Sequence, residues 1–148
     1  VKGVGHGSNE IEAFEMALRD AGIEKLNLVP VSSILPKNVR KISPEEGIKK
    51  LVAGQIAFCV MARKIFDEGE GSVAIGVAQG DTEHGYFVEI ARDDLNARQE
   101  ALETARRLFV SKFGKEPSDI FVESVEAEAK GKTCILVCAV FILPTLIL

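Results

Sequence analysis

Two adjacent serines, Ser32 and Ser33, are the residues whose type and position best suit chemistry on the backbone itself. They follow the apolar run at residues 26–31 and lie shortly before Pro36. A serine hydroxyl held in a strained turn can attack the carbonyl carbon of the preceding residue and convert that amide to an ester. Elimination from the ester leaves dehydroalanine, and its hydrolysis with loss of ammonia leaves a pyruvoyl group. Taken alone, a serine pair at the end of a strand is more typical of an ordinary turn.

Other motifs in the chain give weaker signals. Gly3, Gly5 and Gly7 form a G-x-G-x-G run, but the full spacing of a dinucleotide site and a Walker lysine are missing. A tight turn that permits close packing is therefore favoured over a phosphate site. The only histidines are His6 and His84, and the serine pair does not lie on a G-x-S-x-G elbow. A serine hydrolase is accordingly disfavoured.

The three cysteines, Cys59, Cys134 and Cys138, show neither a C-x-x-C pair nor a neighbouring histidine. This pattern argues against a zinc site and against a disulfide framework. We expect three buried, reduced thiols, no metal, and a location in the reducing cytoplasm.

Around the serine pair, residues 27–36 read Asn-Leu-Val-Pro-Val-Ser-Ser-Ile-Leu-Pro. This tract resembles the processing site of the pyruvoyl-dependent arginine decarboxylase family: asparagine, leucine, three residues, Ser-Ser, an apolar pair and proline. Residues 11–22 resemble the first helix of that family, and residues 84–89 resemble its glutamate-bearing strand. The resemblance is specific because the asparagine, the serine pair and the glutamate occur together, in family order and at family-like separations.

The resemblance implies that the chain is a proenzyme that cleaves itself between Ser32 and Ser33, with Ser33 becoming a covalent pyruvoyl group. That group would replace pyridoxal phosphate as the electron sink of a decarboxylase. The family also implies that the Asn27 amide stabilises the developing oxyanion. In a strand, positions 27 and 33 share a face, which favours proximity. Glu89, on an apolar strand, would be the proton donor in the later reaction on the substrate.

The substrate implied by the resemblance is arginine, converted to agmatine and CO2 in polyamine biosynthesis. Glu15 resembles the family's guanidinium-binding aspartate but is one methylene longer, so the acidic partner is kept while its reach changes. Ile11 and Leu26 resemble residues of the pocket wall, although either could equally be a core residue. The family further implies a homotrimer with active sites between neighbouring subunits.

The elements that must position these residues are read from hydrophobic periodicity and caps. A helix is predicted at residues 9–21, with Asn9 and Glu12 at capping-box spacing and Gly22 as its stop. A second is predicted at residues 97–113, with Asn96 and Gln99 at the same spacing. A helical turn or two is expected after residue 43. Predicted strands comprise a short one at the N-terminus, residues 26–31, a meander of 56–62, 72–78 and 85–91, and a hairpin of 120–127 and 133–143.

Two helices beside many strands, without regular alternation, indicate an α+β fold. The resemblance makes this a layered αββα sandwich of mainly antiparallel sheets with two main helices. At 148 residues and 16.0 kDa, the chain is expected to form a single domain spanning residues 1–148.

The charge and hydropathy of the chain exclude some partners. With a net charge of −4, the sequence does not indicate the basic surface that binding to nucleic acid requires. The apolar run at residues 135–148 is shorter than the roughly 20 residues of a spanning helix, so no membrane contact is expected. We interpret it as a buried strand with an apolar tail, residues 145–148, that could lie against a neighbouring subunit.

The sequence therefore predicts a pyruvoyl-dependent arginine decarboxylase. Two alternatives remain open: a pyruvoyl enzyme of the same architecture acting on another amino acid, and an unprocessed protein that binds a small ligand or nucleotide. The mass of the intact chain separates these classes, because only the pyruvoyl enzymes require two fragments.

Overall fold

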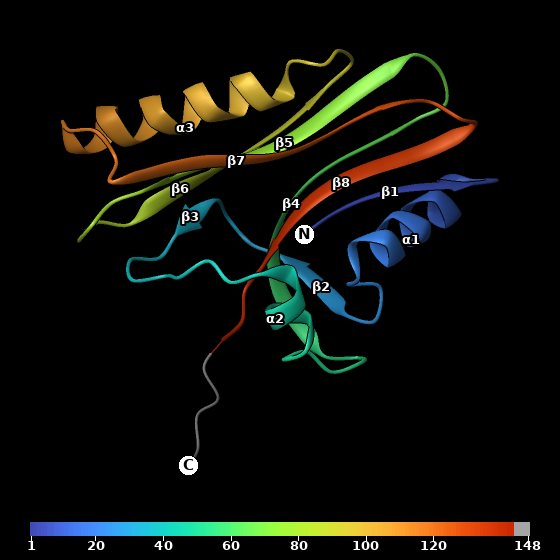
Figure 1. Ribbon diagram of the computed structural model, residues 1–148, viewed down its shortest axis with the longest axis horizontal. Helices are drawn as coiled ribbons and strands as arrows, with labels where there is room; N and C mark the ends of the chain where they lie inside the picture. The colour runs from blue at the N-terminus through green and yellow to red at the C-terminus, as the bar shows by residue number, and fades with distance from the viewer. Residues whose placement is uncertain (144–148) are drawn as a thin grey trace.

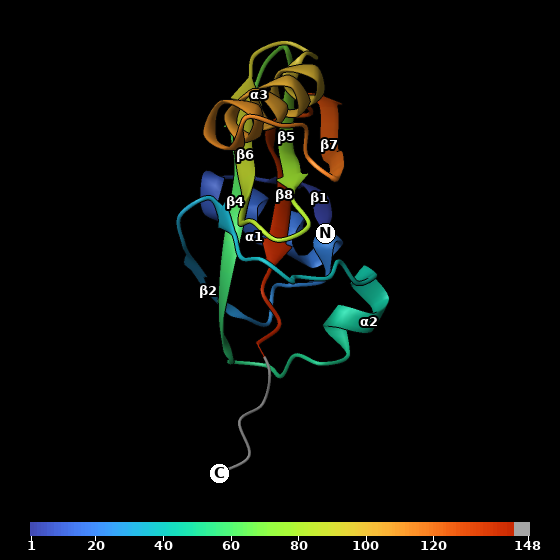
Figure 2. The ribbon, with the colours of Figure 1, turned by 90° about the vertical axis from the view of Figure 1, so that its left-hand side faces the viewer.

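The computed structural model, which describes residues 1–143, consists of two four-stranded sheets packed face to face, with a long helix on each outer side (Figure 1; Figure 2). Sheet A has the strand order β1-β8-β4-β2 and sheet B the order β3-β6-β5-β7. All pairings are antiparallel except β2 with β4. The predicted αββα sandwich of the α+β class is confirmed. The elements in chain order are β1 Lys2–Gly7, α1 Glu10–Ala21, β2 Asn27–Pro30, β3 Ile34–Leu35, α2 Pro44–Ile48, β4 Ile56–Phe66, β5 Glu70–Gln79, β6 Gly85–Arg92, α3 Ala97–Phe113, β7 Asp119–Glu128 and β8 Lys132–Val140.

The main hydrophobic core lies between the two sheets. Its buried members come from both: Leu35, Val60, Ala62, Val73, Ile75, Val77, Phe87, Val125, Ile135 and Val137. A second core lies between α1 and sheet A and contains all three cysteines, which are buried free thiols as predicted. Smaller clusters fill the space between α3 and sheet B.

Helix α1 begins and ends where the sequence predicts. The Asn9 side chain accepts a hydrogen bond from the Glu12 backbone N–H, and Gly22 closes the helix at φ 82°. The glycine run before it is β1 itself and not a turn. A Cβ added at Gly5 would lie 2.1 Å from the backbone nitrogen of Ala17, so glycine is needed for the close approach of α1 to the sheet.

The predicted hairpin is wrong, and of the predicted meander only the antiparallel pairing of β5 with β6 is confirmed, because at the two other connections the chain passes from one sheet to the other. β4 belongs to sheet A, whereas β5 and β6 belong to sheet B. β7 likewise pairs with β5 in sheet B, while β8 pairs with β1 and β4 in sheet A. Alternation of residues identifies each strand but does not say which neighbour it pairs with, so local turn signals were misleading here.

The predicted capping box of α3 is also wrong. The Asn96 side chain makes no capping hydrogen bond. Instead, the buried hydroxyl of Ser72 on β5 accepts a hydrogen bond from the Ala97 backbone N–H at 3.1 Å and donates to the Asp94 carbonyl at 2.6 Å. A tertiary contact thus supplies the cap. The C-terminal stop of α3, Gly114 at φ 69°, is as predicted.

Strand β8 ends at Val140, three residues before the predicted end. The apolar tail at residues 145–148 lies outside the described residues. Within residues 1–143, none of the helices combines the length and the apolar character needed to span a bilayer.

Candidate functional site

The serine pair lies where the chain crosses from sheet A to sheet B. On the upstream side, the Val31 N–H donates to the Cys59 carbonyl of sheet A at 2.8 Å. On the downstream side, the Ser33 carbonyl accepts a hydrogen bond from the Phe87 N–H of sheet B at 2.9 Å. Ser32 is therefore the single residue between two anchors in different sheets, which limits how the bond between the two serines can rotate.

The Ser33 side chain meets the carboxylate of Glu89, 56 residues along the chain. Its Oγ donates to Glu89 Oε1 at 2.7 Å and to Oε2 at 2.8 Å, and both residues are half-buried. The contact arises because β3 pairs with β6, with Ile34 opposite Tyr86, which places Ser33 beside the strand that carries Glu89. A carboxylate at this distance can accept the proton of an attacking hydroxyl.

Asn27 is held elsewhere. It opens β2 opposite Ile56, and its Nδ2 donates to the Gly54 carbonyl at 2.8 Å. The three steps of β2 from Asn27 to Pro30 alone span about 10 Å. Within residues 1–143, no hydrogen bond joins the Asn27 amide to either serine, so a shared strand face did not bring them into contact.

Leu26 and Asn27 instead line a hollow of about 430 Å³ between α1 and the edge of sheet A formed by β2 and β4. The residues that line it are mostly apolar, and Arg63 is the one cation among them. They are Phe14, Leu18, Leu26, Asn27, Leu28, Pro30, Cys59, Met61 and Arg63. The Arg63 guanidinium lies 4.4 Å from the centre of the Phe14 ring. This hollow has the size and composition of a small-molecule site.

Glu15, on α1 next to Phe14, faces the Arg19 guanidinium across one helical turn. The distance from Arg19 Nε to Glu15 Oε2 is 3.4 Å, but this oxygen is buried and accepts no hydrogen bond. The two charged groups attract each other, but the Arg19 N–H is not aligned with the Glu15 oxygen well enough to form a hydrogen bond. A buried carboxylate oxygen without a donor can accept one from a ligand.

The structure thus separates the predicted site residues into groups. Ser32, Ser33 and Glu89 lie at the crossing between the sheets, and Leu26 and Asn27 lie in the hollow. Ile11, on α1 with 82% of its surface exposed, lines neither.

Sequence reasoning missed Phe14 and Arg63. The only signal for Arg63 was a charged residue directly after the apolar stretch that opens a long strand. Phe14 recurs with other apolar residues at helical spacing, which indicates only a buried face, and its contact with Arg63 depends on the packing of α1 against β4, which periodicity does not specify.

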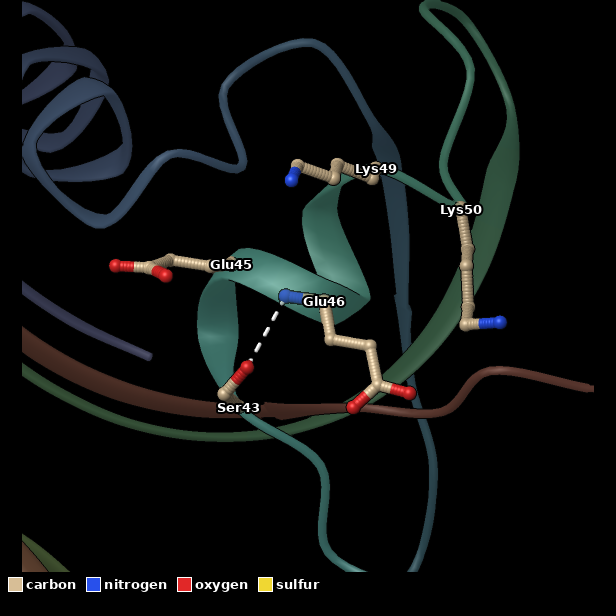
Figure 3. Close-up of a pocket in the computed structure, with 5 residues that line it drawn as sticks. All are labelled: Ser43, Glu45, Glu46, Lys49 and Lys50. Carbon is tan, nitrogen blue, oxygen red and sulfur yellow. Dashed lines mark hydrogen bonds between the residues drawn. The ribbon is translucent and has the colours of Figure 1, made fainter.

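A second hollow, of about 420 Å³, surrounds the short helix α2 (Figure 3). Ser43 caps this helix by accepting a hydrogen bond from the Glu46 N–H, while the side chains of Glu45 and Lys49 extend to one side and that of Lys50 extends to the other. None of the predicted site residues lines it, and the arrangement does not converge on a ligand.

Two of the three thiols are poor nucleophiles. Burial raises the pKa of Cys134 to about 11, and a hydrogen bond with Cys59 together with burial raises the pKa of Cys138 well above its usual range, whereas the same hydrogen bond lowers the pKa of Cys59. Cys134 and Cys138 are therefore protonated near neutral pH. Within residues 1–143, no group of three or more His, Cys, Asp and Glu side chains is arranged to hold a metal ion.

Comparison with known proteins places these features in context. The family model described as pyruvoyl-dependent arginine decarboxylase matches residues 1–144. Pyruvoyl-dependent arginine decarboxylase 2 of Archaeoglobus fulgidus is 39% identical over 148 residues, covering 97% of this chain and 94% of the relative. Pyruvoyl-dependent arginine decarboxylase 1 of the same organism is 38% identical with similar coverage. Pyruvoyl-dependent arginine decarboxylase 1 of Methanosarcina acetivorans is 44% identical over 110 residues, covering 72% of this chain and 66% of the relative.

Proposed function

Because the chain belongs to the pyruvoyl-dependent arginine decarboxylase family, we propose that it converts arginine to agmatine and CO2, with a pyruvoyl group made from its own Ser33. The family consists of decarboxylases that use this covalent group in place of pyridoxal phosphate. The observation that carries the proposal for this chain is the hydrogen bond from Ser33 Oγ to both carboxylate oxygens of Glu89.

The residues at the serine pair fit the formation of this group. Ser33 Oγ, losing its proton to Glu89, attacks the Ser32 carbonyl carbon, and the C–N bond between the residues breaks to give an ester and a free amine at residue 33. Removal of the Cα proton of residue 33 expels the Ser32 carboxylate as the new C-terminus. Water then replaces the nitrogen, which leaves as ammonia. The two backbone anchors at Val31 and Ser33 support this route because they hold the attacking and attacked atoms in one narrow segment.

The pyruvoyl group, once formed, supplies an electron sink for the pair of electrons released with CO2. Glu89 then remains beside residue 33 and is placed to return a proton to the substrate carbon. Its contact with Ser33 extends the role expected from the sequence, where Glu89 was assigned to the later step only. One carboxyl group would accept a proton in cleavage and donate one in decarboxylation.

We further propose that the enzyme is a homotrimer whose neighbouring subunit brings the hollow to the serine pair. The edge of sheet A beside the hollow exposes a cluster of apolar side chains: Val29, Val31, Ile56 and Phe58. Val29 and Phe58 are register partners, so this surface is continuous across β2 and β4. Such a patch is typical of a protein interface. Contact there would let Asn27 of one subunit serve as oxyanion donor for another.

Binding of the substrate side chain is assigned to Glu15. Its buried oxygen without a hydrogen bond supports this role, because a guanidinium offers the paired N–H donors that a carboxylate accepts best. The Arg19 guanidinium, more than half exposed, can swing away when substrate enters. With three reduced thiols and this substrate, we place the enzyme in the cytoplasm.

Glu15→Gln is expected to raise KM for arginine by about tenfold to a hundredfold, because it weakens a charge-assisted hydrogen bond worth about 1.5–3 kcal/mol. The measurement is CO2 release from labelled arginine across substrate concentrations. Glu10→Gln, an exposed carboxylate one turn earlier on α1, is the matched control and should leave KM unchanged. An unchanged KM in Glu15→Gln would move the guanidinium site elsewhere.

The proposed function is tested on the wild-type chain. After incubation near neutral pH, mass spectrometry should resolve two fragments, one ending at Ser32 and one beginning with pyruvoyl, and the cleaved protein should release CO2 fastest from arginine. A chain that stays whole would contradict the enzyme assignment. Faster release from lysine or aspartate would keep the chemistry but replace the substrate.

A further inference from the structure

We propose that Gln79 is a positioning residue, which holds the cofactor-bearing end of the large fragment in place after cleavage. The proposal rests on the self-cleavage proposed above. It concerns what happens to the backbone around residue 33 when its upstream connection is lost.

Cleavage removes one of the two anchors of residue 33. Before it, the chain is tied upstream through Val31 to sheet A and downstream through Phe87 to sheet B. Afterwards residue 33 is a chain end, and the downstream side alone determines its position. That side begins with β3, which has only two residues, Ile34 and Leu35, and a ladder this short holds little by itself.

The next firm attachment downstream is at Val39. Among residues 34–41, only Leu35 is buried and only Val39 is half-buried, and the others are exposed. Asn38, at φ 64°, turns the chain immediately before Val39. The Val39 side chain then packs against the core between the sheets. The Val39 carbonyl accepts a hydrogen bond from Gln79 Nε2 at 2.7 Å.

Gln79 is itself firmly placed, as a positioning residue must be. It ends β5 opposite Asp119 of β7. Its carbonyl accepts hydrogen bonds from the Ser118 N–H at 2.8 Å and from the Ser118 hydroxyl at 3.0 Å. The side-chain amide therefore extends from a fixed backbone to the segment that follows the cleavage site.

A second tie in this segment is weaker. Lys41 Nζ lies 3.1 Å from Glu123 Oε1 and 4.6 Å from the centre of the Phe121 ring. The Lys41 side chain is 58% exposed and the Glu123 side chain 43% exposed, and ion pairs with this much access to solvent contribute little and are screened by salt. The part-buried hydrogen bond from Gln79 is the stronger constraint on residues 34–39.

Gln79→Met keeps the side-chain length and removes the hydrogen-bond donor. Because residue 33 has two anchors before cleavage and one afterwards, this substitution should affect turnover more than self-cleavage. Self-cleavage should stay within about twofold of wild type, because the upstream anchor and Glu89 still hold Ser33. Turnover per pyruvoyl group should fall about fivefold, the effect of one neutral hydrogen bond. KM for arginine should not change, because the hollow on α1 and the Glu15 carboxylate are untouched.

The readout independent of activity is amide hydrogen exchange in the cleaved protein, which should become faster over residues 34–40 in Gln79→Met and not in its uncleaved precursor. Gln99→Met, which removes an exposed side-chain contact to Glu103 on α3, is the matched control and should leave every quantity unchanged. If Gln79→Met fails to fold, Gln79→Ser is the second variant, smaller and polar, and too short to reach Val39.

Equal losses of cleavage and turnover, or unchanged exchange over residues 34–40 in the cleaved variant, would overturn the role of Gln79 while leaving the proposed function intact. A wild-type chain that never cleaves would overturn the proposed function, and with it the premise of this proposal.

Discussion

Ser33→Ala should remain a single chain of full length under conditions in which the wild-type protein is cut to completion. The substitution removes the hydroxyl that is bound to Glu89, and without it no ester can form at the Ser32 carbonyl. Denaturing gels and intact mass measure the outcome directly. Because the pyruvoyl group derives from residue 33, CO2 release from arginine should also fall below detection.

The matched control is Ser32→Ala. Ser32 contributes its carbonyl carbon and not its hydroxyl, which makes no hydrogen bond within the described part of the chain, so this variant should still be cut. Cleavage of Ser33→Ala, or loss of cleavage in Ser32→Ala alone, would mean that the attacking group has been misassigned.

Glu89→Gln should lower CO2 release per pyruvoyl group by about 10²- to 10⁴-fold, the range for loss of a positioned general acid. It should also slow self-cleavage, because an amide cannot accept the Ser33 proton as a carboxylate does. The two effects are measured separately, first by a time course of chain cleavage and then by turnover of the fraction that has been cut.

Glu126→Gln is the control for Glu89→Gln, since Glu126 is an exposed carboxylate on β7 of the same sheet. It should match wild type in both measurements. A Glu89→Gln protein that is cut at the wild-type rate would restrict Glu89 to the reaction on the substrate. Turnover at the wild-type rate would exclude it from that reaction instead.

Local features of the fold could be predicted from the sequence because they depend on neighbouring residues. Asn9 and Gly22 define both ends of α1 through hydrogen bonds and backbone angles within a few positions, and Gly114 ends α3 in the same way. The serine pair was likewise identified from one short tract, and its family context came from the occurrence of Asn27 in that tract together with Glu89, 56 residues beyond Ser33.

Contacts between distant elements could not be predicted. Strands β4 and β8 lie in one sheet, and β5 and β7 lie in the other. This division depends on which strands pair with each other, and the alternation of apolar and polar residues does not specify the pairing. The cap of α3 by Ser72, the placement of Asn27 at Gly54, and the contact of Gln79 with Val39 all join positions more than 20 residues apart. Each depends on packing and not on local spacing.

The strand order of sheet A has a consequence for the cut protein. Residues 1–32 supply β1 at one edge of that sheet, β2 at the other edge and α1 across its outer face. Strand β1 is paired with β8 along its full length, from Lys2 to Gly7. The strands of the small fragment therefore flank β8 and β4 on both sides. The proposed cleavage would leave the small and large fragments bound to each other as a heterodimer within each subunit. Denaturation would then also be a dissociation, and because refolding would require two separate chains to meet, recovery of the native state would depend on protein concentration.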